Sequence, residues 1–168
     1  YVRASRVPIY FIGVALGFAI ASGVASAAAT IVITNGNAAG VGFNDSTPAA
    51  PVGGNTGTTL GQQRLNAFQA AANIWGATLT STVSINILAT FEPLACTATA
   101  ATLGSAGATE VLSDFPDAPI SGAWYSYALA NMLPRVDQDA GTPQLRPRFN
   151  TKVEFTPNLH AVSPYRSC

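Results

Sequence analysis

One segment of the chain, residues 58–81, has a helical period and restricts the fold more than any other segment. Apolar residues recur at the spacing of a single helix stripe: Leu65, Phe68, Ala72, Trp75 and Leu79. Thr59 followed three residues later by Gln62 is typical of a capping box, which predicts a helix that begins near Leu60. The rest of the chain is therefore expected to pack around one long helix.

The face opposite this stripe carries no charge. It presents Ala67, Ala70, Ile74 and Ala77. A helix with little charge on either face is usually covered on two sides. Two interpretations follow: the helix lies between a sheet and loops of this chain, or Ile74 packs on a further layer that these residues do not supply.

The remaining periodic segments predict short strands and one short helix. The strands are expected at residues 30–34, 83–91, 109–115 and 149–155, and the helix at residues 127–133, capped by Ser126. The segment 83–91 alternates apolar and polar residues, as a half-buried strand does. The predicted class is α+β: one long helix packed on a small mixed or antiparallel sheet, with long Gly/Pro-rich loops and an N-terminal signal helix.

Residues 1–27 have the three parts of a secretory signal peptide. Arg3 and Arg6 give a positive start, residues 9–24 are apolar, and Ala25-Ser26-Ala27 forms an A-x-A cleavage site. An uncleaved membrane anchor is the alternative, because the apolar run approaches the length of a spanning helix. The prediction is a secreted or periplasmic protein that has no membrane segment after cleavage. Residues 28–157 then form one α+β domain and residues 158–168 an irregular tail.

The low charge content limits the classes of partner that the protein can bind. Only 10% of the 168 residues are charged, with eight basic and eight acidic side chains, which argues against a nucleic-acid partner.

The two cysteines, Cys96 and Cys168, are candidates for a disulfide in an exported protein. That bridge would close a loop of about 70 residues and stabilise the fold by roughly 4 kcal/mol. Two free thiols are the alternative, since the last residue of a chain often frays.

No complete catalytic or metal-binding set is present. The single histidine, His160, lies in a Pro-flanked tail and has no second histidine one helical turn away. Asp137 and Asp139 have the spacing that begins a calcium loop, but the closing acidic residue is absent and a solvated turn explains them better. The sequence alone therefore assigns no catalytic, cofactor-binding or metal-binding residue.

Three aromatic residues, Trp124, Tyr125 and Tyr127, are candidates for a face that contacts a sugar or a peptide. The alternative is an apolar rim packed on the short helix.

Several motifs together resemble a known group. They are GFND at residues 42–45, the run at residues 51–96 that contains TTLGQQR and the following strand, and the later segments LGSAGA, DFPDAP, WYSYALAN and RFN. Over about residues 28–150 the chain resembles the N-terminal region of secreted bacterial zinc-metallopeptidase-like proteins, many of which carry a protease-associated (PA) domain. After Phe149-Asn150 the sequence departs from that pattern.

The resemblance implies a scaffold and not a catalyst. In that family a later helix carries a His-Glu-x-x-His motif whose histidines bind zinc and whose glutamate activates water. No residue of this chain corresponds to that motif, so the expectation is a fragment of a hydrolase without catalysis of its own. Zinc and a peptide or protein substrate are expected for the full-length protein. The alternative function is a secreted, non-catalytic binding or adhesion module.

Overall fold

The computed structural model describes residues 27–153. The predicted signal peptide up to Ser26, the tail at residues 158–168 and the end of the last predicted strand lie outside the described residues. Among the described residues, no helix has the length and apolar content needed to cross a membrane.

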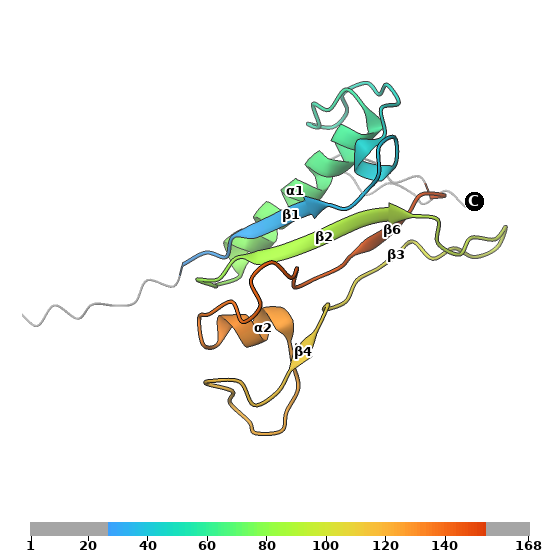
Figure 1. Ribbon diagram of the computed structural model, residues 1–168. Helices are drawn as coiled ribbons and strands as arrows, with labels where there is room; N and C mark the ends of the chain where they lie inside the picture. The colour runs from blue at the N-terminus through green and yellow to red at the C-terminus, as the bar shows by residue number, and fades with distance from the viewer. Residues whose placement is uncertain (1–26, 154–168) are drawn as a thin grey trace, which may run out of the picture.

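The fold is α+β, with a helix of 19 residues, a mixed sheet of four strands and a small antiparallel sheet (Figure 1). The four-stranded sheet has the order β1-β2-β6-β3. The small sheet pairs β4 with β5 and is followed by a short helix. The elements in chain order are β1 (Ile31–Asn35), the 3-10 turn η1 (Gly42–Asn44), α1 (Leu60–Thr78), β2 (Ile85–Glu92), β3 (Gly104–Ser105), β4 (Val111–Leu112), β5 (Tyr125–Ser126), α2 (Tyr127–Met132) and β6 (Arg148–Asn150).

The elements β1, α1 and β2 form a βαβ unit. β1 and β2 pair in parallel, with Ile31 opposite Ile85 and Asn35 opposite Ala89, and α1 connects them. A parallel pair needs a crossover connection of this kind. β6 continues the sheet in parallel beside β2, with Phe91 opposite Phe149, and β3 then runs antiparallel to β6. The predicted mixed sheet behind one long helix is therefore present.

The core lies between α1 and one face of this sheet. Phe43, Ala89 and Phe91 are buried, and the partly buried residues packed against them are Ile33, Leu65, Phe68, Ile87 and Phe149. The predicted alternation of β2 is confirmed, because Ile87, Ala89 and Phe91 all face this core. The α1 stripe is confirmed only at Leu65, Phe68 and Ala72.

The C-terminal half of α1 packs differently from the prediction. Trp75 is 59% exposed and Leu79 is 40% exposed, whereas Gly76 is buried. The backbone before β1 explains the change: Ala29 N donates to Gly76 O, and a Cβ on Gly76 would lie 2.8 Å from Ala29 O. The helix touches this segment along its glycine, so Trp75 turns away from the contact. Ile74 is 69% exposed, so the described residues do not cover this half of the helix on its second side. The alternative, a further layer over Ile74 that these residues do not supply, stays a prediction.

The N-terminal half of α1 is covered by the loop that precedes it. Thr59 Oγ1 accepts from Gln62 N at 3.2 Å, which confirms the predicted start of the helix. In a capping box the Gln side chain also accepts from the backbone N–H of the cap residue. Here Gln62 Oε1 accepts instead from Thr58 N, one residue before Thr59, at 2.9 Å. Buried Gln63 holds the loop itself, with its Nε2 donating to Ala50 O and Gly57 O.

Two other predicted elements are shorter or packed differently. The strand predicted at residues 109–115 is reduced to β4, because Thr109 N instead donates to Gln144 O and Asp114 has a φ of 52°. The helix α2 begins where predicted, but the Ser126 side chain makes no capping hydrogen bond. Its buried residues are Tyr127, Ala130 and Asn131.

We predict that Gly61→Ala destabilises the protein. A Cβ at this position of α1 would lie 2.5 Å from Phe43 O and 2.8 Å from both Asp45 N and Asp45 O, all of them backbone atoms. Helix propensity alone would favour alanine by about 1 kcal/mol, but overpacking against the backbone costs about 1–3 kcal/mol. The net effect expected in urea unfolding is a loss of stability.

Gly107→Ala is the matched control, because a Cβ there would meet no atom within 4 Å. Its free energy of unfolding should stay within about 0.5 kcal/mol of the wild type. A Gly61→Ala variant as stable as this control would contradict the close packing of η1 on α1.

Candidate functional site

One outer edge of the four-stranded sheet, at β3, is formed by an exposed backbone segment. The ladder with β6 extends beyond β3 over residues 103–109: Asn150 N donates to Leu103 O, Arg146 N to Gly107 O, and Thr109 N to Gln144 O. The register is constant, with Ser105 opposite Arg148 and Ala108 opposite Leu145. We call residues 103–109 the edge strand.

Alternation in this ladder leaves one side of the edge strand open. Odd-numbered residues bond toward β6, so the backbone N–H and C=O groups of Gly104, Ala106 and Ala108 point outward. Residues 103–108 are all exposed. Such an edge can accept another extended chain through main-chain hydrogen bonds.

A hollow lies beside the edge strand. It has a volume of about 490 Å³ and is lined by residues 105–109 together with Arg146 and Arg148. Arg148 Nε donates to Ser105 Oγ at 3.1 Å, and its Nη1 lies 3.6 Å from Glu92 Oε2. The lining thus combines hydroxyl groups, backbone amides and two guanidinium groups.

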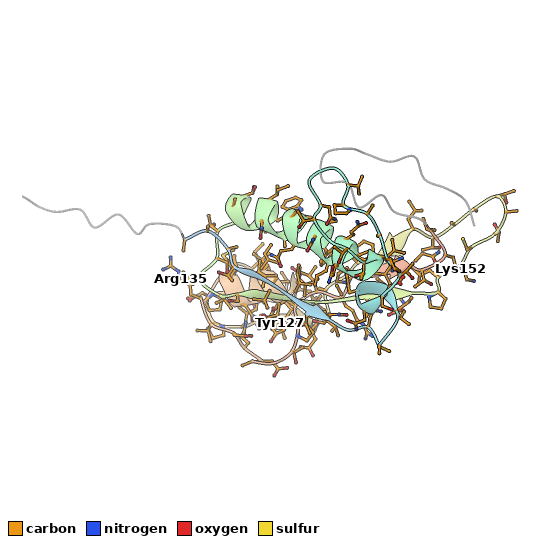
Figure 2. All side chains as sticks on the ribbon, turned by 90° about the horizontal axis from the view of Figure 1, so that it is seen from above. Tyr127, Arg135 and Lys152 are labelled. Carbon is orange, nitrogen blue, oxygen red and sulfur yellow. The ribbon has the colours of Figure 1, made fainter. Side chains whose placement is uncertain are left out.

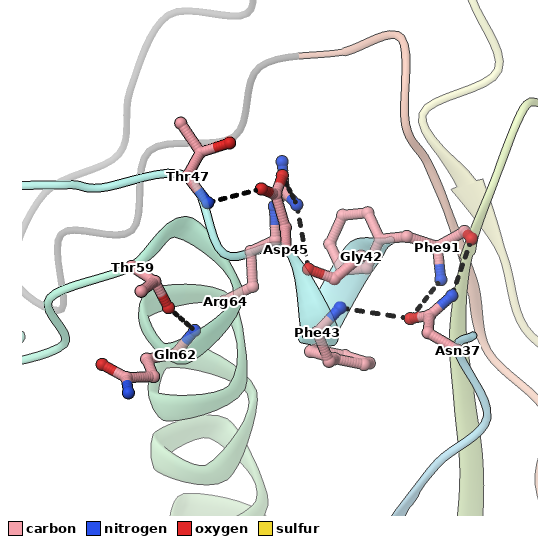
Figure 3. A network of polar contacts seen from close by, with 9 residues as sticks. All are labelled: Asn37, Gly42, Phe43, Asp45, Thr47, Thr59, Gln62, Arg64 and Phe91. Atoms are coloured by element: carbon pink, nitrogen blue, oxygen red, sulfur yellow. Dashed lines mark hydrogen bonds and ion pairs between the residues drawn. The ribbon is translucent and has the colours of Figure 1, made fainter. Parts of the chain in front are cut away.

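The GFND motif forms a hydrogen-bonded clamp at the end of β1 (Figure 3). Asn37 Nδ2 donates to Phe91 O at 2.9 Å, while its Oδ1 accepts from Phe43 N and Phe91 N at 3.2 Å each. Gly42 has a φ of +58°, and a Cβ on it would lie 2.3 Å from Asn37 Oδ1, so only glycine fits. These groups form hydrogen bonds with one another, so the clamp has a structural role.

Arg64 joins this clamp to α1. Its Nη1 donates to Gly42 O at 2.9 Å and to Asp45 Oδ2 at 3.0 Å, and its guanidinium lies 5.0 Å from the centre of the Phe91 ring. Hydrogen bonds from Thr47 are the main cause that lowers the pKa of the Asp45 carboxyl, and Arg64 adds to the shift. The motif quoted for the family resemblance thus holds α1 against the sheet.

The three candidate aromatics do not share one accessible face. Trp124 is 70% exposed, whereas Tyr125 is half-buried, with its ring edge against Phe115 and its hydroxyl accepting from Ile120 N. Tyr127 is fully buried, and Figure 2 places it in the interior of the molecule. A ligand at this surface would therefore meet Trp124 and part of Tyr125, but not Tyr127.

Tyr127 instead ties α2 to the turn that contains the two aspartates. Its hydroxyl donates to Asp139 O at 2.8 Å and lies 3.2 Å from Asp137 Oδ1. Asn131 Nδ2 also donates to Asp137, and Thr142 Oγ1 donates to Asp139 Oδ2. Burial raises the pKa of the Tyr127 phenol. Both aspartates thus serve as hydrogen-bond acceptors within a turn of the chain.

Among the described residues, no three His, Cys, Asp or Glu side chains come together as metal ligands. His160 lies outside this part of the chain. Cys96 lies within it and is not a free thiol, but Cys168 lies outside it. The Cys96–Cys168 pairing therefore stays a prediction.

Sequence periodicity predicts no strand at residues 103–108, although LGSAGA and RFN, which contain this segment and Arg148, are among the motifs of the family resemblance. Arg146 lies in neither motif. The Gly- and Ala-rich segment LGSAGA has low strand propensity and no apolar alternation. The signal that could have located the site is Arg-x-Arg at residues 146–148, since residues two apart on a strand face the same side.

Comparisons with protein-family models, curated proteins and solved structures found no match to this chain. The resemblance to the zinc-metallopeptidase-like proteins is thus carried by the motifs alone.

We predict that Asp45→Asn reduces the loss of stability in acid. A carboxyl whose pKa is lower in the folded protein contributes stability above its unfolded pKa of about 4 and loses it as the pH falls through the folded pKa. Between pH 6 and pH 3 the wild type should therefore lose more stability than the variant. At pH 6 the variant should be about 1 kcal/mol less stable, because the ion pair with Arg64 is gone. Urea unfolding at each pH measures both effects, and parallel pH curves for the two proteins would contradict the prediction.

Proposed function

We propose that residues 28–157 are the scaffold portion of an exported zinc-metallopeptidase-like protein, without catalysis of their own. The observation that carries the proposal is the open edge strand of a mixed sheet backed by one long helix. In this role the edge strand receives an extended peptide segment of the substrate. The zinc site belongs to a different part of the full-length protein.

The arrangement of the sheet supports this role in two ways. Among the described residues, the edge strand lies at one end of the sheet order β1-β2-β6-β3, runs antiparallel to β6, and has no strand paired on its outer side. The opposite side of the same ladder is anchored through β6 to the Phe core, where Phe149 packs on Phe68 and Phe91. A peptide added at this edge would thus bind to a segment that is hydrogen-bonded to a well-anchored strand.

The secretory signal expected at residues 1–27 supports a secreted or periplasmic location for this scaffold. The low charge content supports a peptide or protein partner rather than nucleic acid. A full-length protein of this kind would use zinc, with its ligands supplied outside residues 28–157.

The second candidate function is a secreted binding or adhesion module. The exposure of Trp124 (70%) and of nearby Ile120 (65%) favours it, because large exposed apolar side chains close together are typical of binding surfaces. Such a module would recognise its partner through Trp124, and replacing this residue would weaken the interaction. The edge strand would have no part in that interaction.

We predict that the exported chain binds an extended peptide through backbone hydrogen bonds. The probe is a fluorescein-labelled octapeptide of alternating Thr and Val with a central Asn, amidated at its C-terminus. Fluorescence anisotropy should show saturable binding, and N-methylation of alternate peptide bonds should abolish it because the donors are lost.

Two variants of one residue test the same contact from the side of the protein. Ala106→Pro removes an outward N–H without touching the ladder to β6 and should abolish binding. Ala106→Val keeps that N–H and should bind as the wild type does. Equal binding of the N-methylated peptide, or stoichiometric zinc held tightly by the purified chain, would contradict the scaffold role. Binding that depends on Trp124 and not on Ala106 would favour the adhesion module.

A further inference from the structure

We propose that the hollow over the edge strand and β6 binds a carboxylate of the incoming peptide, with Arg146 as the residue that recognises it. The proposal rests on the peptide-binding role of the edge strand and adds a substrate preference to it: extended segments that carry an acidic side chain.

Strand register places the arginines on one face. Ser105 lies opposite Arg148, and Gly107 lies opposite Arg146, because Arg146 N donates to Gly107 O. Residues two apart on a strand point to the same side, so both guanidinium groups rise over the edge strand. This is the face away from α1, since Phe149, the residue after Arg148, points to the opposite side and packs on Phe68 of α1.

The two arginines differ in the hydrogen-bond and ion-pair partners that they already have. Arg148 donates to Ser105 Oγ and lies 3.6 Å from Glu92 Oε2, so part of its charge is neutralised. Arg146 is exposed, and within the described part of the chain it has no ion-pair partner. One positive charge therefore faces the hollow without a counter-charge from residues 27–153.

Gly107 connects this charge to the open edge. A strand added outside the edge strand lies two strand spacings, or about 10 Å, from β6. The Arg146 side chain can extend in that direction because the residue opposite it has no side chain, and a Cβ on Gly107 would meet nothing within 4 Å. Gly107 is among the residues that line the hollow. The end of the arginine can thus meet a side chain of the added strand.

A carboxylate is the group that fits best. The planar guanidinium fork binds a carboxylate with two parallel hydrogen bonds, which gives orientation as well as attraction. An acidic residue of an added strand whose side chain lies on the arginine face would approach Arg146 over Gly107. The C-terminal carboxylate of a peptide has the same chemistry, so the experiment separates these two sources.

The experiment compares four octapeptides on the exported chain by fluorescence anisotropy. They are the neutral Asn peptide with an amidated end, the same peptide with Asp in place of the central Asn, the Asn peptide with a free C-terminus, and the Asp peptide with alternate N-methylation. The Asp peptide should bind about 3–10-fold more tightly than the Asn peptide, as expected for a partly exposed charged pair. The preference should shrink as salt is raised from 0.15 M to 0.5 M.

Two variants test the residues that carry the preference. Arg146→Gln should bind the Asp and Asn peptides equally. Gly107→Val keeps the charge but closes the path over the edge strand, and should also lose the preference. Arg135→Gln is the control of equal charge change, because Arg135 is exposed in the turn after α2 and is not part of the hollow (Figure 2). It should keep the full preference, and far-UV circular dichroism verifies that each variant is folded.

The possible results distinguish the carboxylate proposal from the peptide-binding proposal on which it rests. If the Asp and Asn peptides bind the wild type equally and N-methylation abolishes binding, the carboxylate proposal is wrong and the peptide-binding edge stands. If the N-methylated Asp peptide binds as tightly as the unmethylated one, the hollow binds an anion but the strand-addition role fails. A preference only for the free C-terminus assigns the site to terminal carboxylates and overturns the side-chain proposal. A preference that survives Arg146→Gln overturns the role of this residue.

Discussion

Four phenylalanines hold the described part of the chain together. Phe43 comes from η1, Phe68 from α1, Phe91 from β2 and Phe149 from β6, and neighbouring ring centres lie 5.2–5.8 Å apart. Tilted, edge-to-face and stacked pairs of this kind add about 0.5–1.5 kcal/mol each beyond the burial of their apolar area. Because the four elements are far apart in the sequence, this cluster decides where β6 lies relative to the βαβ unit.

The position of β6 in turn creates the edge. One side of β6 pairs with β2 and its Phe149 is held in the cluster, so its other side is the template on which residues 103–109 form a strand. The edge strand contributes little apolar area of its own, since its residues are mainly glycine and alanine. A weakly packed segment with a well-anchored neighbour presents ordered backbone groups at an open edge. The hollow, Arg146 and the proposed peptide contact all depend on that arrangement.

Sequence periodicity predicted the parts of the fold that bury large side chains. The start of α1 at Leu60, the core face of β2 and the α+β class all follow from the spacing of apolar residues and from the cap at Thr59. The failures share a cause, because they occur where small residues or backbone contacts decide the packing. Gly76 replaces Trp75 at the contact with Ala29, and the LGSAGA segment forms a strand only through its pairing with β6. Tyr127 is a candidate for a ligand-facing aromatic by sequence, but the structure buries it, and its hydroxyl bonds to a turn ten or more residues away.

The open edge is tested most directly by hydrogen exchange of individual backbone amides, followed by NMR. Ser105 and Thr109 donate toward β6, whereas the N–H groups of Ala106 and Ala108 point outward. We expect slow exchange at Ser105 and Thr109, fast exchange at Ala106 and Ala108, and protection of Ala106 and Ala108 when the Asp-containing octapeptide is added. Equal protection of all four amides in the free protein would show that this edge is already covered, and would contradict the account.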